Sequence, residues 1–197
     1  MEILVWNEND YMKKSIFIIP VIIIIVGILL SVYYENNPMS KDSSVSNNNP
    51  QILRVSSSAF ENEGTIPAEF TCDGQDISPP LSITNIPKDV KTLSLIMTDP
   101  DAPGGNFTHW AVWNIPSSKT EFAKGEKFDF PQGRTGFETP AYGGPCPPSG
   151  THRYLIKIYA LDAELDLTEG SSVTDLQKAM DGHIITESTL MGKYSRN

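Results

Sequence analysis

Two proline-containing turns carry the residues best suited to chemistry in this chain. Residues 99–103 read Asp-Pro-Asp-Ala-Pro, and His109 and Trp110 follow shortly after. Residues 143–148 read Gly-Gly-Pro-Cys-Pro-Pro, and residues 152–154 then read His-Arg-Tyr. Proline fixes φ and restricts the residue before it, so each turn is expected to hold one shape. If the two turns meet in space, two aspartates, two histidines and a tyrosine converge on one pocket.

The first turn supplies carboxylates at the end of an apolar run. Asp99 is placed to accept hydrogen bonds from backbone amides or to orient a histidine, and Asp101 to do either or to line the rim of the pocket. His109 opens the next apolar run, and a cationic or donor imidazole suits an anion. Taken alone, the segment also has the composition of an ordinary turn.

The second turn supplies backbone groups as well as side chains. Gly143 and Gly144 allow close approach of a ligand, and backbone N–H groups in such a turn can bind an anion. His152 and Tyr154 have the same parity on the following strand and so point to one side, with Arg153 on the other. The predicted ligand-binding residues are therefore Asp99, Asp101, His109, Gly143, Gly144, His152 and Tyr154.

Metal binding and covalent catalysis are weaker interpretations of the same residues. Two His and two Asp suit zinc, but no closely spaced histidine pair is present. Cys146 with His152 is a conceivable nucleophile and base, yet the prolines around Cys146 favour a structural cysteine. We therefore predict a binding module with no metal and no cofactor, rather than an enzyme.

Cys72 and Cys146 are the two cysteines of the chain. Two cysteines outside a membrane often pair, and a bond between these two would brace the pocket if Cys72 packs near the glycine turn. The distance between them cannot be read from the sequence, so the candidate disulfide stays open at this stage.

The net charge of the chain limits the classes of partner that it can bind. The formal net charge is −9 over 197 residues. Nucleic-acid binding relies on Lys and Arg against phosphates, so no nucleic-acid partner is expected.

The N-terminal region reads as a membrane anchor. Residues 15–34 carry no charge, and about 20 apolar residues suffice for a helix to cross a bilayer. Lys13 and Lys14 precede this run, which favours a cytoplasmic segment 1–14 and a C-terminal domain outside the cell membrane. Residues 35–51 have linker composition, and the domain occupies 52–197. A cleaved signal peptide is the alternative.

The elements that must position the two turns are mainly strands. Apolar runs at residues 92–98, 109–115 and 153–161 are rich in β-branched and aromatic side chains, and their near-continuous apolarity predicts strands buried on both faces. Weaker strands are expected at 53–58 and 82–86, and a final strand at 184–194. One helix is expected at 173–181, capped by Thr174 and stopped by Gly182. The predicted fold is a β-sandwich with one or two small helices.

These motifs resemble the phosphatidylethanolamine-binding protein family, in particular its bacterial and archaeal Raf kinase inhibitor-like branch. The Asp-Pro-Asp-Ala-Pro turn, the His-Trp strand, the Gly-Gly-Pro-Cys-Pro-Pro turn and the His-Arg-Tyr strand stand in family order. The resemblance covers about residues 52–196. It implies a Greek-key β-sandwich whose pocket binds phosphate or phosphorylated head groups. By motif position, Asp99, Asp101, His109, Gly144, His152 and Tyr154 match the family's pocket residues.

Three functions follow as expectations. The first is a membrane-anchored, extracytoplasmic binding module for a small anion or a phosphorylated ligand, without enzymatic activity. The second is a protein inhibitor of a protease or kinase, whose protein target is unknown. The third is a hydrolase that uses the same histidines and aspartates.

Overall fold

The computed structural model describes residues 27–33, 35 and 52–196. The chain divides into two compact units, residues 1–48 and 49–197. In the first unit, residues 27–33 and Glu35 are helical. The predicted segments 1–14 and 36–51 lie outside the described residues.

The membrane prediction needs correction. Among the residues that the structure describes, no helix is long and apolar enough to cross a membrane. Of the expected span 15–34, residues 27–33 belong to the described residues, and residues 15–26 and Tyr34 lie outside them. This finding overturns the predicted single-pass anchor and, with it, the extracytoplasmic location.

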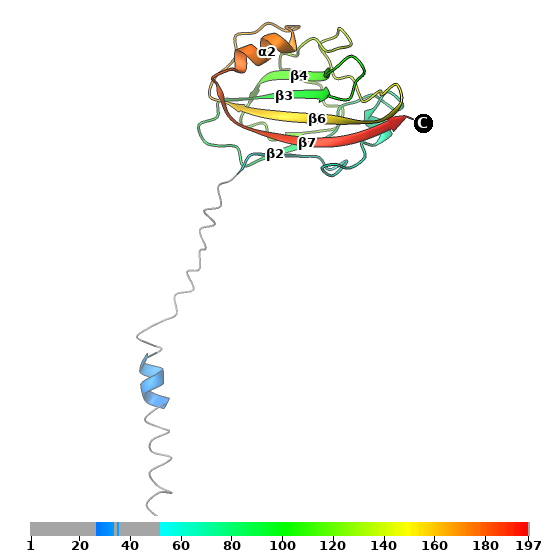
Figure 1. Cartoon of the computed structure of the whole chain (residues 1–197). Helices are drawn as coiled ribbons and strands as arrows, with labels where there is room; N and C mark the ends of the chain where they lie inside the picture. The colour runs from blue at the N-terminus through cyan, green and yellow to red at the C-terminus, as the bar shows by residue number, and fades with distance from the viewer. Residues whose placement is uncertain (1–26, 34, 36–51, 197) are drawn as a thin grey trace, which may run out of the picture. The chain divides into compact units, whose positions relative to one another are not determined.

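The domain is mostly β, as predicted, and its strands form two antiparallel sheets (Figure 1). The larger sheet has four strands, which Figure 1 shows side by side in the order β4, β3, β6, β7. Their bounds are β3 Thr92–Asp99, β4 Phe107–Pro116, β6 Gly150–Leu161 and β7 Ile184–Arg196. The smaller sheet has the order β1, β2, β5, with bounds Arg54–Ser56, Leu81–Thr84 and Glu121–Phe122.

The four-stranded sheet is covered on both faces, which explains its near-continuous apolar strands. One face shares a core with the small sheet, to which Leu95, Tyr154 and Ile156 contribute beside Ile83 of β2. The other face packs under helix α2, Val173–Met180, through residues that include Ile96, Ala111, Trp113, Leu176 and Met180. The first six of the eight residues of β3 are all buried. Because successive side chains of a strand point to opposite faces, the prediction of a strand buried on both faces is confirmed.

The ends of the elements differ from the sequence prediction by a few residues. Helix α2 begins after Ser172, whose hydroxyl accepts a hydrogen bond from the Asp175 N–H, so Ser172 rather than Thr174 is the cap. Gly182 follows the helix with φ 77°, a conformation that glycine adopts easily. The sequence analysis missed two short elements, strand β5 and the 3-10 helix η1, Ala68–Phe70, because each contains too few residues to show a periodic pattern.

Candidate functional site

The candidate site lies at one end of the large sheet, where the ends of three neighbouring strands meet. Strands β3 and β6 are antiparallel, so the end of β3 lies beside the start of β6, with Thr98 opposite Leu155. Strand β4 starts at the same end of the sheet, where Phe107 lies opposite Asp99. This topology brings the two proline turns together, although Gly143 lies 44 positions after Asp99 in the sequence.

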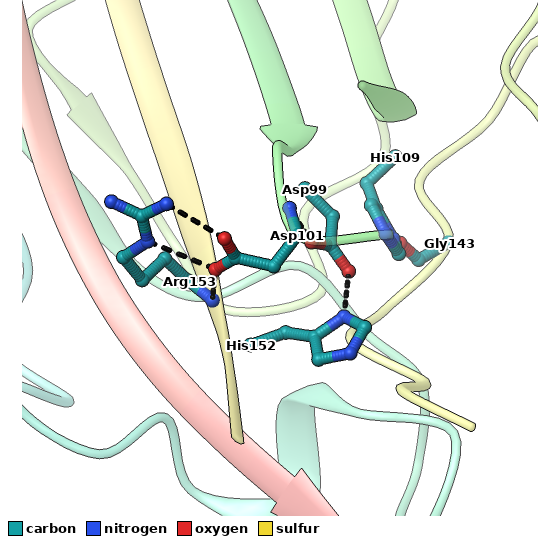
Figure 2. Close-up of polar contacts among 6 residues, drawn as sticks. All are labelled: Asp99, Asp101, His109, Gly143, His152 and Arg153. Carbon is teal, nitrogen blue, oxygen red and sulfur yellow. Dashed lines mark hydrogen bonds and ion pairs between the residues drawn. The ribbon is translucent and has the colours of Figure 1, made fainter. Parts of the chain in front are cut away.

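A buried aspartate–histidine pair lies at this end of the sheet, between β3 and β6. The Nδ1 atom of His152 lies 2.7 Å from Oδ2 of Asp99, and the two side chains are only 9% and 5% exposed (Figure 2). The other carboxylate oxygen of Asp99 accepts the backbone N–H of Asp101 at 2.8 Å. A carboxylate accepts but does not donate, so Nδ1 of His152 carries the hydrogen and Nε2 is the ring nitrogen left for other contacts.

Asp101 belongs to a separate, exposed ion pair. Figure 2 shows its carboxylate turned toward Arg153, which binds it with Nε at 2.9 Å and a terminal nitrogen at 2.6 Å. The backbone N–H of Arg153 also donates to this carboxylate. These hydrogen bonds hold the pKa of Asp101 well below its usual range. Asp101 therefore fixes the turn against β6, on the side of the strand opposite to His152.

His109 is buried and bonded to the glycine turn. Its Nδ1 lies 2.8 Å from the carbonyl oxygen of Gly143, and the Gly143 N–H donates back to the His109 carbonyl at 3.0 Å. Burial lowers the pKa of His109, against the opposing effects of the Gly143 hydrogen bond and the Asp99 charge. A neutral ring whose Nδ1 donates to a carbonyl has a lone pair on Nε2. His109 is thus an acceptor at Nε2 rather than the cationic donor expected from the sequence.

Tyr154 brings a buried hydroxyl without a partner. The residue is fully buried, and no group among the described residues forms a hydrogen bond of good geometry with its hydroxyl, although the Asp99 carboxylate and the Cys146 backbone lie close to it. Its ring stands edge-on to His109, with the ring centroids 5.2 Å apart. Burial, together with the nearby Asp99 charge, raises the pKa of Tyr154, so the hydroxyl keeps its proton. An unmade hydrogen bond of this kind costs about 1–3 kcal/mol.

The glycine turn plays a different role from the predicted one. The Gly143 N–H is used by the His109 carbonyl, and the Gly144 N–H donates to the Asp76 carboxylate at 2.6 Å. Both amides are therefore occupied, and the turn orients His109 rather than offering N–H groups to an anion. Asp76 escaped the sequence analysis because its partner lies 68 residues further along the chain.

The two cysteines are joined. Cys72 and Cys146 form a disulfide with a Cα–Cα distance of 5.4 Å, which resolves the pairing that the sequence left open. The backbone N–H of Cys72 also donates to the Pro145 carbonyl. The bond therefore ties the glycine turn to the segment that carries Asp76.

Two phenylalanines, also missed by the sequence analysis, complete the surroundings of His109. The Phe107 and Phe137 rings both stand edge-on to His109, with centroids 5.1 and 5.4 Å away. Nothing in their local sequence distinguishes them from core residues. Within the described residues, no group of three or more His, Cys, Asp or Glu side chains is arranged to hold a metal ion. The site therefore offers hydrogen-bonding groups in an aromatic setting.

Comparisons with known proteins agree with this architecture. The profile of the phosphatidylethanolamine-binding protein family matches residues 56–195. A UPF0098 protein of Methanothermobacter thermautotrophicus is 44% identical over 150 residues, which cover 73% of this chain and 99% of the relative. That relative thus corresponds to the β domain alone.

Two solved structures share the fold. The putative phosphatidylethanolamine-binding protein homologue CT736 of Chlamydia trachomatis has a TM-score of 0.73 and 38% identity, over 75% of this chain and 99% of its own. YbcL of E. coli, described as a member of the mammalian family, has a TM-score of 0.69 and 25% identity, over 74% and 99% of the two chains. The resemblance found in the motifs is thereby confirmed, and this chain belongs to the phosphatidylethanolamine-binding protein family.

Proposed function

We propose that the domain binds a small phosphate-type anion, inorganic phosphate or a phosphomonoester, at the cluster formed by Asp99, His109, His152 and Tyr154. The proposed role is binding rather than catalysis, and the proposed partner is a small molecule. Membership of a family named for a phosphate-containing lipid supports this class of ligand.

The observation that carries the proposal is the Tyr154 hydroxyl. A neutral O–H group buried without a partner is costly, and a phosphoryl oxygen is a strong acceptor that would satisfy it. The Tyr154 ring contacts the His109 ring. The Nδ1 atoms of His109 and His152 are already engaged, so the Nε2 atoms of both histidines are the groups left to face a ligand.

The two histidines suit different parts of a phosphate. Anion binding at His152 requires a hydrogen on Nε2 as well as on Nδ1, and the Asp99 carboxylate accepts the Nδ1 hydrogen. The Nε2 lone pair of His109 suits a donor, such as the hydroxyl of a phosphate monoanion or an ammonium group on the ligand. Together with Tyr154, this arrangement favours a protonated phosphoryl group over a fully ionised one.

Thermal unfolding with and without inorganic phosphate or phosphoethanolamine tests the proposal. A ligand at 100 times its Kd adds about 2.7 kcal/mol to the free energy of unfolding, which raises the Tm by several degrees. We expect His152→Ala to abolish this gain and His183→Ala, which alters an exposed histidine outside the cluster, to keep it. No shift in the wild-type protein with either compound would refute phosphate binding.

The same samples test the two other functions expected from the sequence. Release of inorganic phosphate from phosphoethanolamine, lost in His109→Ala, would show a hydrolase instead of a binding module. Inhibition of a protease or kinase that persists in His152→Ala would show that another surface carries the activity.

A further inference from the structure

Phe137 is the exposed member of an otherwise buried group of rings. Phe137 is 43% exposed, whereas His109 and Tyr154 are buried. The Phe137 ring contacts Phe107 at a centroid distance of 4.9 Å and His109 at 5.4 Å, edge-on in both cases. The Phe137 ring therefore lies between His109 and the surface of the protein and covers this histidine.

The same ring also lies directly against the glycine turn. A Cβ atom added to Gly143 would overlap two ring carbons of Phe137, so only glycine leaves room for the ring at this position. Gly143 is the residue that holds His109 through its carbonyl. Phe137 therefore covers both partners of the His109–Gly143 contact.

The turn that carries Phe137 is held in place by a buried threonine. The Thr135 hydroxyl donates to the Thr139 carbonyl at 3.0 Å and accepts the Phe137 N–H at 3.2 Å. The Thr135 N–H also donates to the Thr139 carbonyl, and the Gly136 N–H to the Thr108 carbonyl. The backbone is thus fixed, and the ring can leave its position only by side-chain rotation.

We infer that Phe137 determines which phosphate-type ligands the site accepts, by limiting the size of the substituent on the phosphoryl group. This inference rests on the proposed function. A compact anion reaches His109 and Tyr154 beneath the ring, whereas a bulky substituent must displace the ring and lose its contacts with Phe107 and His109. The ring therefore selects against large organic groups without contributing a polar contact of its own.

Calorimetric titration of the full chain with inorganic phosphate and with phenyl phosphate tests the inference. We expect Phe137→Ala to raise the affinity for phenyl phosphate at least tenfold relative to that for inorganic phosphate. Phe137→Leu keeps part of the cover and should give a smaller rise. The matched control is Ile184→Ala, because Ile184 is also 43% exposed and starts β7 beside Leu161, at the far end of β6 from His152.

The outcomes separate this inference from the proposed function. If the wild-type protein binds inorganic phosphate but the ratio of affinities is unchanged in Phe137→Ala, size selection by Phe137 is wrong. If phenyl phosphate binds more weakly to Phe137→Ala, the ring contacts the substituent favourably, and the inference is again wrong. If the wild-type protein binds neither compound, phosphate binding fails and the selectivity assigned to Phe137 fails with it.

Discussion

Among the described residues, two aspartate–histidine pairs have nearly the same hydrogen-bond distance and very different surroundings. His152 Nδ1 lies 2.7 Å from Asp99, and His183 Nδ1 lies 2.8 Å from Asp162. The side chains of the first pair are 9% and 5% exposed, whereas those of the second are 47% and 54% exposed. The hydrogen bond alone therefore does not distinguish a binding site from a surface contact.

The difference lies in what surrounds each pair. The first lies near a buried, unpartnered tyrosine hydroxyl and beside a turn that a disulfide holds. The second lies at the surface, beyond the end of α2, where the His183 N–H bonds the Met180 carbonyl. Exposed pairs of this kind contribute about 0–1 kcal/mol, because water competes for both partners. Burial therefore makes the first pair the more important of the two for stability.

Removal of the disulfide should have the largest effect, because the bond braces the turn that holds His109, next to the buried pair. Cys72 and Cys146 are 74 residues apart in sequence, and a loop of that length contributes about 4 kcal/mol to stability in the chain-entropy model. We expect the double variant Cys72→Ser, Cys146→Ser to lose stability on this scale in urea unfolding. Imidazole NMR signals should change for His109 more than for His183, and equal changes would show that the disulfide does not brace the site.

The next largest effect should come from the aspartates themselves. Asp99→Ala leaves both the His152 Nδ1–H and the Asp101 N–H without their acceptor inside the protein, at a cost of about 3 kcal/mol. Asp162→Ala removes an exposed partner and should cost less than about 1 kcal/mol. Urea unfolding of both variants measures the difference. Similar losses would mean that burial does not distinguish the pairs.

Acid should destabilise the chain through His109. Burial lowers the pKa of His109 below its ordinary value of 6.5, so the unfolded chain takes up this proton first as the pH falls. The stability contributed by neutral His109 is therefore present above about pH 6.5 and is lost as the pH falls toward the lowered pKa. His109→Asn keeps a donor for the Gly143 carbonyl but cannot titrate in this range.

The measurement for His109 is the free energy of unfolding between pH 7 and pH 5. We expect His109→Asn to lose less stability over this range than the wild type. A wild-type slope in His109→Asn would place the acid sensitivity elsewhere.

The smallest effect is expected at the exposed Asp101–Arg153 pair. Arg153→Lys keeps the charge but loses the two-point contact with the carboxylate. Because Asp101 also bonds Asp99 through its backbone N–H, we expect a small change in His152 NMR signals and little change in stability. A loss of stability as large as that of Asp99→Ala would show that the exposed pair holds the turn.

The sequence predicted the parts of the molecule that depend on apolar runs and on the alternation of side chains along a strand. The long strands β3, β4 and β6 follow from their apolar runs, and the shared side of His152 and Tyr154 follows from strand parity. The central pair was also within reach, because aspartate orients histidine in many sites and both residues stand at strand ends.

The sequence could not predict contacts between distant segments. The Gly144 N–H is occupied by Asp76, 68 residues away, and the Gly143 N–H by the His109 carbonyl, so the turn does not offer its amides to an anion. The exposure of Phe137 is likewise a tertiary property. The membrane anchor was inferred from a run of apolar residues alone, and no spanning helix is present among the described residues.

The most direct test of the account compares the two histidine pairs during one phosphate titration. Proton–nitrogen NMR spectra of the imidazole rings report His152 and His183 in the same sample. We predict that inorganic phosphate shifts the Nε2 signal of His152 saturably, that Asp99→Asn weakens this response at least tenfold, and that Asp162→Asn leaves it unchanged. Equal shifts of His152 and His183, or no shift of His152 at all, would contradict the account.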